Sequence, residues 1–170
     1  MTNTSKPVIG VSRCLLGDAV RYDGAAKPCR IVIEQLGQQF ELVAVCPEVE
    51  AGLPVPRPPV QLTGPAGRPR MTGRDDPQLD VTESLQAFCE RRIPQLAGLS
   101  GFVFKSRSPS CALGSAPLYV DGKCVSPELD GLFAAALRRR YPQLPVIDEC
   151  GLEQPAMRAA FIRAVQGGER

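Results

Sequence analysis

A chain of 170 residues can bury a hydrophobic core, and its 44% hydrophobic and 22% charged residues are typical of a soluble globular protein. The net charge of +2 is too small to indicate nucleic-acid binding, and no apolar run approaches membrane-spanning length. The amino terminus lacks a secretion-signal pattern. We therefore expect one cytoplasmic domain, residues 1–170, without a nucleic-acid polymer or a membrane as partner.

The chain contains seven cysteines and no histidine. An odd number of cysteines without a secretion signal argues against a disulfide framework. The absence of histidine excludes Ser-His triads and zinc sites that use histidine. Any catalysis must therefore use a carboxylate, a serine, a lysine, a cysteine or a metal.

The first third of the chain predicts two strands separated by a helix. Apolar runs at residues 6–11 and 42–45 are typical of buried strands. Pro28 is well placed to open the helix. The apolar spacing predicts a helical face turned to the core, made of Cys29, Val32, Ile33 and Leu36.

Residues 52–80 are rich in proline and glycine, and the alternation at 60–63 predicts a β-hairpin or flap inserted near the sheet. Asp80 and Glu83 resemble a capping box at the start of the next helix. The core face of that helix is predicted to contain Val81, Leu85, Phe88, Cys89 and Leu96.

The remaining chain predicts a third strand at 102–104 and a fourth at 146–147. Between them we expect a small hairpin at 118–125, turning at Asp121-Gly122, and a helix that starts at Ser126-Pro127. A last helix is expected to bury Met157, Ala160, Phe161, Ala164 and Val165.

Alternation of strands and helices predicts an α/β fold: a Rossmann-like three-layer sandwich with a mainly parallel sheet of about four strands plus the hairpin insertion. In such sheets ligands bind beyond the carboxyl ends of the strands. Cys14, Cys46 and Cys111 each follow a predicted strand, so we expect them to converge. Cys150 also follows a strand and is a fourth candidate.

Convergence of three cysteines favours a metal site over three buried thiols. Zinc sites usually use close cysteine pairs, and the chain has no C-x-x-C. Three thiolates from three loops suit a cubane iron–sulfur cluster and would leave one iron open.

Three motifs carry a resemblance to a known family. They are VSRCLLG with VRYDG at 11–24, CPEV with GLP and PRPP at 46–59, and KSRSPSC at 105–111. In this order they resemble a bacterial family formerly known as a domain of unknown function, which includes the TudS-type thiouracil desulfidases. The resemblance is to the short, single-domain form.

The resemblance implies a [4Fe–4S] cluster held by Cys14, Cys46 and Cys111, with one open iron acting as a Lewis acid. The implied substrate is a small thiolated pyrimidine, a thiouracil or thiouridine-type compound, which yields a uracil derivative and hydrosulfide without net redox change. The resemblance also marks Glu48 as catalytic base or proton shuttle, and Ser108, with Ser106 as the second choice, as the catalytic serine.

Several alternatives stay open at this point. The chain could be a non-catalytic metal- or cluster-binding regulatory module, or a sulfur carrier that uses one cysteine. The serines could be loop caps. Arg21 and Arg57 could bind a phosphate, or pair with Asp23 and Glu50. Ala112 stands where the family pattern has glycine, which puts the local loop shape in question.

Overall fold

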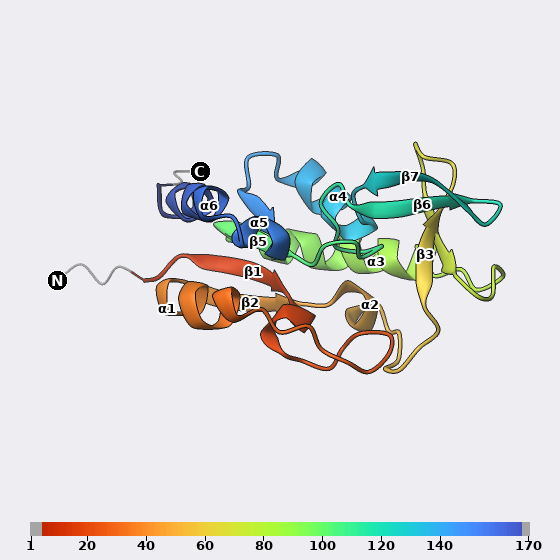
Figure 1. Cartoon of the computed structure of the whole chain (residues 1–170), viewed down its shortest axis with the longest axis horizontal. Coiled ribbons are helices and arrows are strands. Elements are labelled where there is room, and N and C mark those ends of the chain that lie inside the picture. The colour runs from red at the N-terminus through yellow and green to blue at the C-terminus, as the bar shows by residue number, and fades with distance from the viewer. Residues whose placement is uncertain (1–4, 168–170) are drawn as a thin grey trace.

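The computed structural model describes residues 5–167 and has a parallel β-sheet at its centre. Four strands form this sheet in the order β2-β1-β5-β8, and each neighbouring pair is parallel. Their bounds are β1, Val8–Ser12; β2, Glu41–Val45; β5, Gly101–Phe104; and β8, Val146–Asp148. All four predicted strands are confirmed, and Figure 1 shows β1, β2 and β5 side by side.

Side chains of this sheet alternate between two hydrophobic clusters, because successive residues of a strand point to opposite faces. Val103 belongs to one cluster, whereas Phe102 and Phe104 belong to the other, with their rings stacked at a centroid distance of 4.3 Å. Helices complete the two clusters. The cluster of Val103 includes side chains of η2, Ile31–Leu36, and α6, Pro155–Gly167. The cluster of Phe102 and Phe104 includes side chains of α3, Thr82–Arg92, and α4, Leu132–Arg140. The α/β class is confirmed, and the narrower Rossmann-like sandwich stays a prediction.

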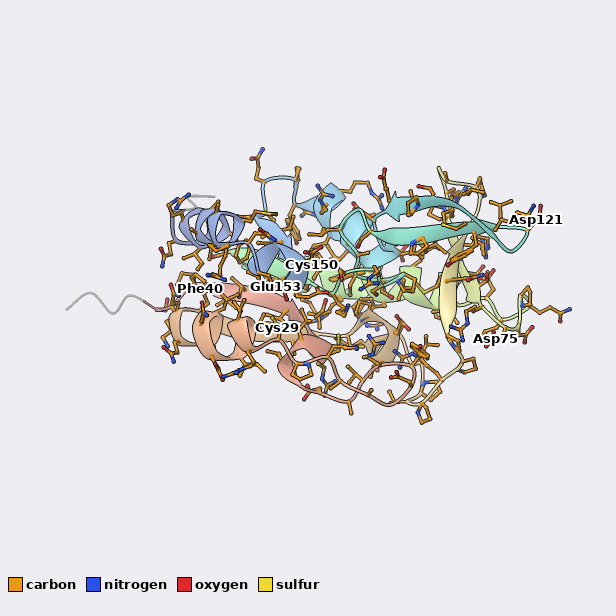
Figure 2. All side chains as sticks on the ribbon, viewed as in Figure 1. Cys29, Phe40, Asp75, Asp121, Cys150 and Glu153 are labelled. Carbon is orange, nitrogen blue, oxygen red and sulfur yellow. The ribbon has the colours of Figure 1, made fainter. Side chains whose placement is uncertain are left out.

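A second, mixed sheet joins two hairpins in the order β4-β3-β6-β7. Its strands are β3, Val60–Thr63; β4, Arg70–Gly73; β6, Ala116–Val120; and β7, Lys123–Leu129. The predicted hairpin within 52–80 forms, but it is not a separate flap, since β3 pairs in parallel with β6. The second hairpin turns at Asp121-Gly122 as predicted, with both φ angles positive, and Figure 2 shows Asp121 at its tip.

Short helical segments complete the chain and lie mostly at strand ends. They are η1, Arg13–Leu16; α1, Gly37–Gln39; α2, Pro47–Glu50; η3, Ile93–Leu96; and α5, Glu149–Leu152. Within residues 5–167, no helix is both long and apolar enough to span a membrane.

The predicted helix start at Ser126-Pro127 is wrong, because these residues lie on β7 and the helix α4 begins at Leu132. β7 is an edge strand of the second sheet, and an edge position tolerates a proline that lacks an N–H group. The capping box at Asp80 and Glu83 is also wrong. α3 begins at Thr82, whose N–H donates to Asp80 at 3.0 Å.

Two predicted core faces are wrong in part. Ile33 is 43% exposed and Cys29 is half-buried, because residues 31–36 wind as a π-helix, whose wider turn shifts the spacing of the apolar positions. On α6, Phe161 and Val165 are buried as predicted. The other three positions, Met157, Ala160 and Ala164, face solvent.

Candidate active site

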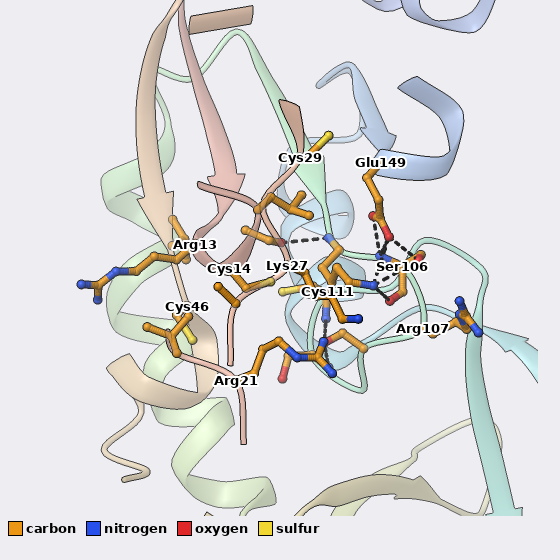
Figure 3. Close-up of a pocket in the computed structure, with 18 of the residues that line it drawn as sticks. Arg13, Cys14, Arg21, Lys27, Cys29, Cys46, Ser106, Arg107, Cys111 and Glu149 are labelled. Atoms are coloured by element: carbon orange, nitrogen blue, oxygen red, sulfur yellow. Dashed lines mark hydrogen bonds and ion pairs between the residues drawn. The ribbon is translucent and has the colours of Figure 1, made fainter. Parts of the chain in front are cut away.

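A pocket of about 910 Å³ lies beyond the carboxyl edge of the parallel sheet. Cys46 follows β2, Cys14 follows β1 and the Cys111 loop follows β5, so three adjacent strand ends supply one cysteine each. All three line the pocket, and Figure 3 shows them around the same space. The predicted convergence is confirmed. Cys29 also lines the pocket, whereas Cys150 does not.

Cys14 is held by the tight turn that ends β1. Its carbonyl oxygen accepts the N–H of Gly17 at 3.2 Å and that of Lys27 at 3.1 Å. Gly17 adopts φ 95°, a conformation that favours glycine, so the turn closes without strain. These bonds fix the backbone at Cys14, whose side chain lines the pocket.

Cys46 is held by the first turn of α2. Its N–H donates to the Glu50 carboxylate at 2.8 Å. Burial raises the pKa of the Cys46 thiol, and the backbone N–H groups of Val49 and Glu48 act to lower it. Pro47 suits this position, because the first residue of a helix needs no hydrogen-bonded N–H. The turn therefore presents both the Cys46 sulfur and the Glu48 side chain to the pocket.

The loop of Cys111 is fixed from within by Ser108. The Ser108 hydroxyl oxygen accepts the N–H of Ser110 at 3.1 Å and that of Cys111 at 3.0 Å. The first turn of α4 binds the loop from outside, because the N–H of Leu132 donates to Pro109 at 2.9 Å. The backbone of the Cys111 loop is thus held both by Ser108 and by the first turn of α4, and this fixes the position of the Cys111 side chain.

Burial raises the pKa of all three thiols, to about 11 for Cys14 and well above the ordinary value for Cys111. Cys14 and Cys46 each raise the pKa of Cys111 further, because thiolates in one pocket repel. Lys105 and Arg21 act in the opposite direction on Cys14. The three thiols would therefore ionise together only with a strongly positive partner among them, such as a metal centre.

Glu48 is a half-buried carboxylate of the pocket, with 14% of its side chain exposed, and both of its oxygens have partners. Oε1 accepts a hydrogen bond from Arg57 Nε at 3.1 Å, and Oε2 accepts one from the Ser110 hydroxyl at 2.9 Å. Arg57 is only 5% exposed and also donates to the carbonyl oxygens of Pro54 and Val20. The carboxylate of Glu48 is therefore fixed in orientation.

A second carboxylate, Glu149, lies at the end of β8 on the same pocket. It accepts hydrogen bonds from the Ser106 hydroxyl and N–H and from Lys105 Nζ, the last at 3.1 Å. Burial acts to raise the pKa of Glu149, but these bonds outweigh it, so its pKa lies below the ordinary value of 4.5. Glu149 thereby fixes the Ser106 loop against the sheet.

Sequence reasoning missed Ser110 and Glu149. Ser110 belongs to the recognised third motif and adjoins Cys111, which was a usable signal, but nothing in the sequence shows which serine reaches Glu48. Glu149 lies two residues beyond the predicted strand at 146–147, and Cys46 lies directly beyond the one at 42–45. The position of Glu149 there was a signal of the same kind.

The structure shows which carboxylates lie near Arg57 and Arg21, and how alanine is accommodated at position 112. Arg57 pairs with Glu48 and not with Glu50, while Arg21 lies 3.7 Å from Asp23. Ala112 is fully buried and has no positive φ, so its methyl group packs into the core and does not distort the loop.

A family model described as 2-thiouracil desulfurase matches residues 9–149. The chain belongs to the 2-thiouracil desulfurase family. A solved structure described as a [4Fe–4S]-dependent thiouracil desulfidase, TudS, shares 33% identity and a TM-score of 0.70, covering 92% of this chain and 99% of that one. No curated protein matches the chain. The predicted resemblance to this desulfurase family is confirmed.

The donor set of this desulfurase pocket fits an iron–sulfur cluster. Three thiols from different strand ends surround one space, and thiolates are the usual ligands of such clusters. Among residues 5–167, no group of three or more Cys, Asp or Glu side chains is arranged to hold a single metal ion. The assignment of all three thiols as ligands therefore remains a proposal.

Proposed function

We propose that the pocket hydrolyses the carbon–sulfur bond of a thiolated uracil, using a [4Fe–4S] cluster bound by Cys14, Cys46 and Cys111. The observation that carries this proposal is the arrangement of the pocket, in which three thiols from adjacent strand ends lie beside the fixed carboxylate of Glu48. When bound, the cluster would supply an open iron that polarises the thiocarbonyl sulfur as a Lewis acid.

The net reaction exchanges one sulfur atom for one oxygen atom. A water molecule adds its oxygen to the thiocarbonyl carbon, the carbon–sulfur bond breaks, and sulfur leaves as hydrosulfide with its electron pair. The two protons of water are distributed between hydrosulfide and solvent. No atom changes its oxidation state, so the proposed reaction needs no electron donor or acceptor.

Glu48 serves in this proposal as the base that accepts a proton from the attacking water. Its two oxygens are held by Arg57 and Ser110, so the carboxylate does not need to rotate before it acts. Ser110 belongs to the Cys111 loop, and its hydroxyl donates to the Glu48 carboxylate. A proton could therefore pass to Glu48 directly or through Ser110.

Ser108 serves as a proton donor to the substrate. Its oxygen accepts two backbone N–H groups, and this polarises its own O–H group toward donation. Within residues 5–167 its hydroxyl hydrogen has no assigned acceptor, and Ser108 lines the pocket. Ser106 is the second choice, because its hydroxyl already donates to Glu149.

The narrower expectations about the chain are proposals too. We propose a single Rossmann-like domain over residues 1–170 that acts in the cytoplasm on a small molecule and not on a nucleic-acid polymer. The parallel sheet with helical cover on both faces supports the first part. A pocket of about 910 Å³ supports the second, because it has the size of small-molecule sites.

The decisive test combines reconstitution with turnover under anaerobic conditions. We expect the reconstituted protein to show a broad absorption band near ~400 nm and to release equal amounts of uracil and hydrosulfide from 2- or 4-thiouracil. A protein that keeps the band but releases no hydrosulfide from either compound would instead be a cluster-bearing binding module.

A further inference from the structure

Arg21 is a cation of the pocket whose donors are largely unused. Its Nε is buried yet has no hydrogen-bond partner within residues 5–167, and it lies 3.7 Å from Asp23, beyond hydrogen-bond length. No other side-chain hydrogen bond of Arg21 occurs in the described part of the chain. A buried donor without a partner is costly, so this guanidinium is suited to a ligand that supplies an acceptor.

Backbone hydrogen bonds close the turn that carries Arg21. The N–H of Gly24 donates to the Arg21 carbonyl at 2.9 Å, and the Arg21 N–H donates to the Ala25 carbonyl at 3.2 Å. The Asp23 oxygen nearest to Arg21 accepts the N–H of Ala25 at 3.0 Å and forms only a long ion pair with Arg21, at 3.7 Å from its Nε. The turn therefore fixes the backbone of Arg21, while the Arg21 Nε remains without a hydrogen-bond partner in the described part of the chain.

The guanidinium of Arg21 lies close to the reacting end of the pocket. Arg21 lines the same pocket as Cys14, Cys46 and Cys111, and Figure 3 shows it beside these three cysteines. The ring of Tyr22 lies against it, with 5.8 Å from the guanidinium carbon to the ring centroid. A ligand in this pocket can therefore meet both the Arg21 guanidinium and the cysteines.

We infer that Arg21 binds the ring carbonyl oxygen of the thiouracil and thereby sets the preference for oxo-substituted thiopyrimidines. This inference rests on the proposed desulfidase function. The planar guanidinium presents its donors in a fixed fork, which suits a carbonyl oxygen with its two lone pairs. A thiouracil has one such oxygen, on the carbon that is separated from the sulfur-bearing carbon by one ring nitrogen, whereas pyrimidine-4-thione has none.

A substrate that lacks the ring carbonyl oxygen tests this assignment. The test uses the ratio of kcat/KM values for two substrates and does not depend on the absolute rate of either. We compare kcat/KM for 4-thiouracil and for pyrimidine-4-thione in the anaerobic holoenzyme and in its Arg21→Gln variant. In the unmodified holoenzyme the missing oxygen should cost on the order of 10- to 100-fold, as expected for a hydrogen bond to a charged group. In Arg21→Gln the preference should fall to about threefold or less, whereas an unchanged preference would overturn the inference.

Arg30→Gln is the matched control. Arg30 lines the same pocket, but its side chain is 85% exposed and pairs with Glu34 at 3.2 Å. Removing this charge should leave the preference for 4-thiouracil unchanged. Equal losses of preference in Arg21→Gln and Arg30→Gln would show a general effect of pocket charge and would overturn the inference. Iron content and absorption spectrum must match among the three proteins, and loss of iron in Arg21→Gln would assign the residue to cluster retention instead.

Assays with 4-thiouridine monophosphate distinguish whether Arg21 binds a ring carbonyl or a phosphate. If Arg21 binds the carbonyl, Arg21→Gln lowers kcat/KM for 4-thiouracil and for 4-thiouridine monophosphate by the same factor. A loss confined to the monophosphate would overturn the carbonyl assignment. If no compound is turned over by the unmodified holoenzyme, the proposed function fails. Calorimetric Kd values for 4-thiouracil and pyrimidine-4-thione then test Arg21 by the same comparison.

Discussion

Gly131 lies directly against the backbone of Cys111, because a Cβ built on Gly131 would come within 2.5 Å of the Cys111 nitrogen. It would also come within 2.3 Å of the Ser110 carbonyl carbon. No flexible side chain is available to move aside, since the atoms met are backbone. The close approach lets the N–H groups that begin α4 reach the carbonyl oxygens of this loop.

Gly131→Ala should therefore displace the Cys111 loop. We expect the free energy of unfolding to fall by about 1–3 kcal/mol, as for other overpacked sites, and iron per chain to fall after reconstitution. Thermal melting of the apoprotein and iron analysis measure the two effects. Gly98→Ala is the control, since a Cβ there meets nothing within 4 Å. Full iron in Gly131→Ala would show that the loop tolerates the shift.

Replacing Cys14, Cys46 or Cys111 by alanine should each remove most of the iron. Their thiols surround one space, whereas Cys89 lies in the core and Cys124 is exposed on β7. Iron per chain in anaerobically prepared variants measures this. Cys29→Ala and Cys150→Ala should keep full iron. The ligand assignment fails if one of these two variants loses iron or if Cys111→Ala retains it.

Glu48→Gln should preserve the spectrum and slow turnover. Glutamine keeps the shape of the side chain but lacks a basic carboxylate, and loss of a general base costs on the order of 10²–10⁴-fold in rate. Single-turnover hydrosulfide release measures the effect. Glu50→Gln is the comparison, because Glu50 holds the Cys46 N–H and Arg92 and does not line the pocket. Unchanged turnover in Glu48→Gln would eliminate Glu48 as the base.

The two serines of the Cys111 loop should differ in what their loss affects. Ser110→Ala removes the hydrogen bond to Glu48 but no bond that shapes the loop, so iron should stay and kcat should fall about tenfold or more. Ser108→Ala removes the acceptor of two backbone N–H groups, so iron retention should fall as well. Iron content and kcat, measured on the same samples, separate these effects. Equal iron loss in both variants would contradict the assignment.

The stabilisation that Glu149 provides should depend on pH. Its folded-state pKa is depressed below the ordinary value of 4.5, so its contribution is complete above that value and is lost as pH falls through the folded pKa. Glu149→Gln should therefore lower the free energy of unfolding of the apoprotein at pH 7 by roughly 1–2 kcal/mol, a discounted figure because the pair is partly exposed. Urea unfolding at pH 7 and at progressively lower pH measures it. A penalty that grows on acidification would contradict the assignment.

Much of the fold was predictable because strand and turn chemistry is local. Buried apolar runs located all four strands of the parallel sheet, and two positive φ angles at Asp121-Gly122 matched the expected hairpin turn. The start of α4 was missed because Pro127 reads as a helix opener, whereas its place on an edge strand depends on pairing with β6. The exposed face of Ile33 was missed because π-helical winding leaves no periodic signature.

The meeting of the three cysteines in one pocket was predictable, since sheet topology brings the ends of parallel strands together. The roles of individual polar side chains were not, because they depend on contacts between distant segments. Ser110 and Glu48 are separated by 62 positions in the sequence. Arg57 reaches Glu48 only after the segment following α2 folds back.

The order of strands in the parallel sheet also constrains how the protein matures. The thiol-bearing ends belong to β2, β1 and β5, and β5 becomes available only after about 100 residues have been synthesised. On the proposed assignment of Cys14, Cys46 and Cys111 as ligands, no short peptide of this chain contains a complete ligand set, and we expect iron insertion to follow formation of the sheet. Iron content therefore reports the fraction of chains that have folded, and a destabilising substitution far from the pocket would appear first as a metal deficiency.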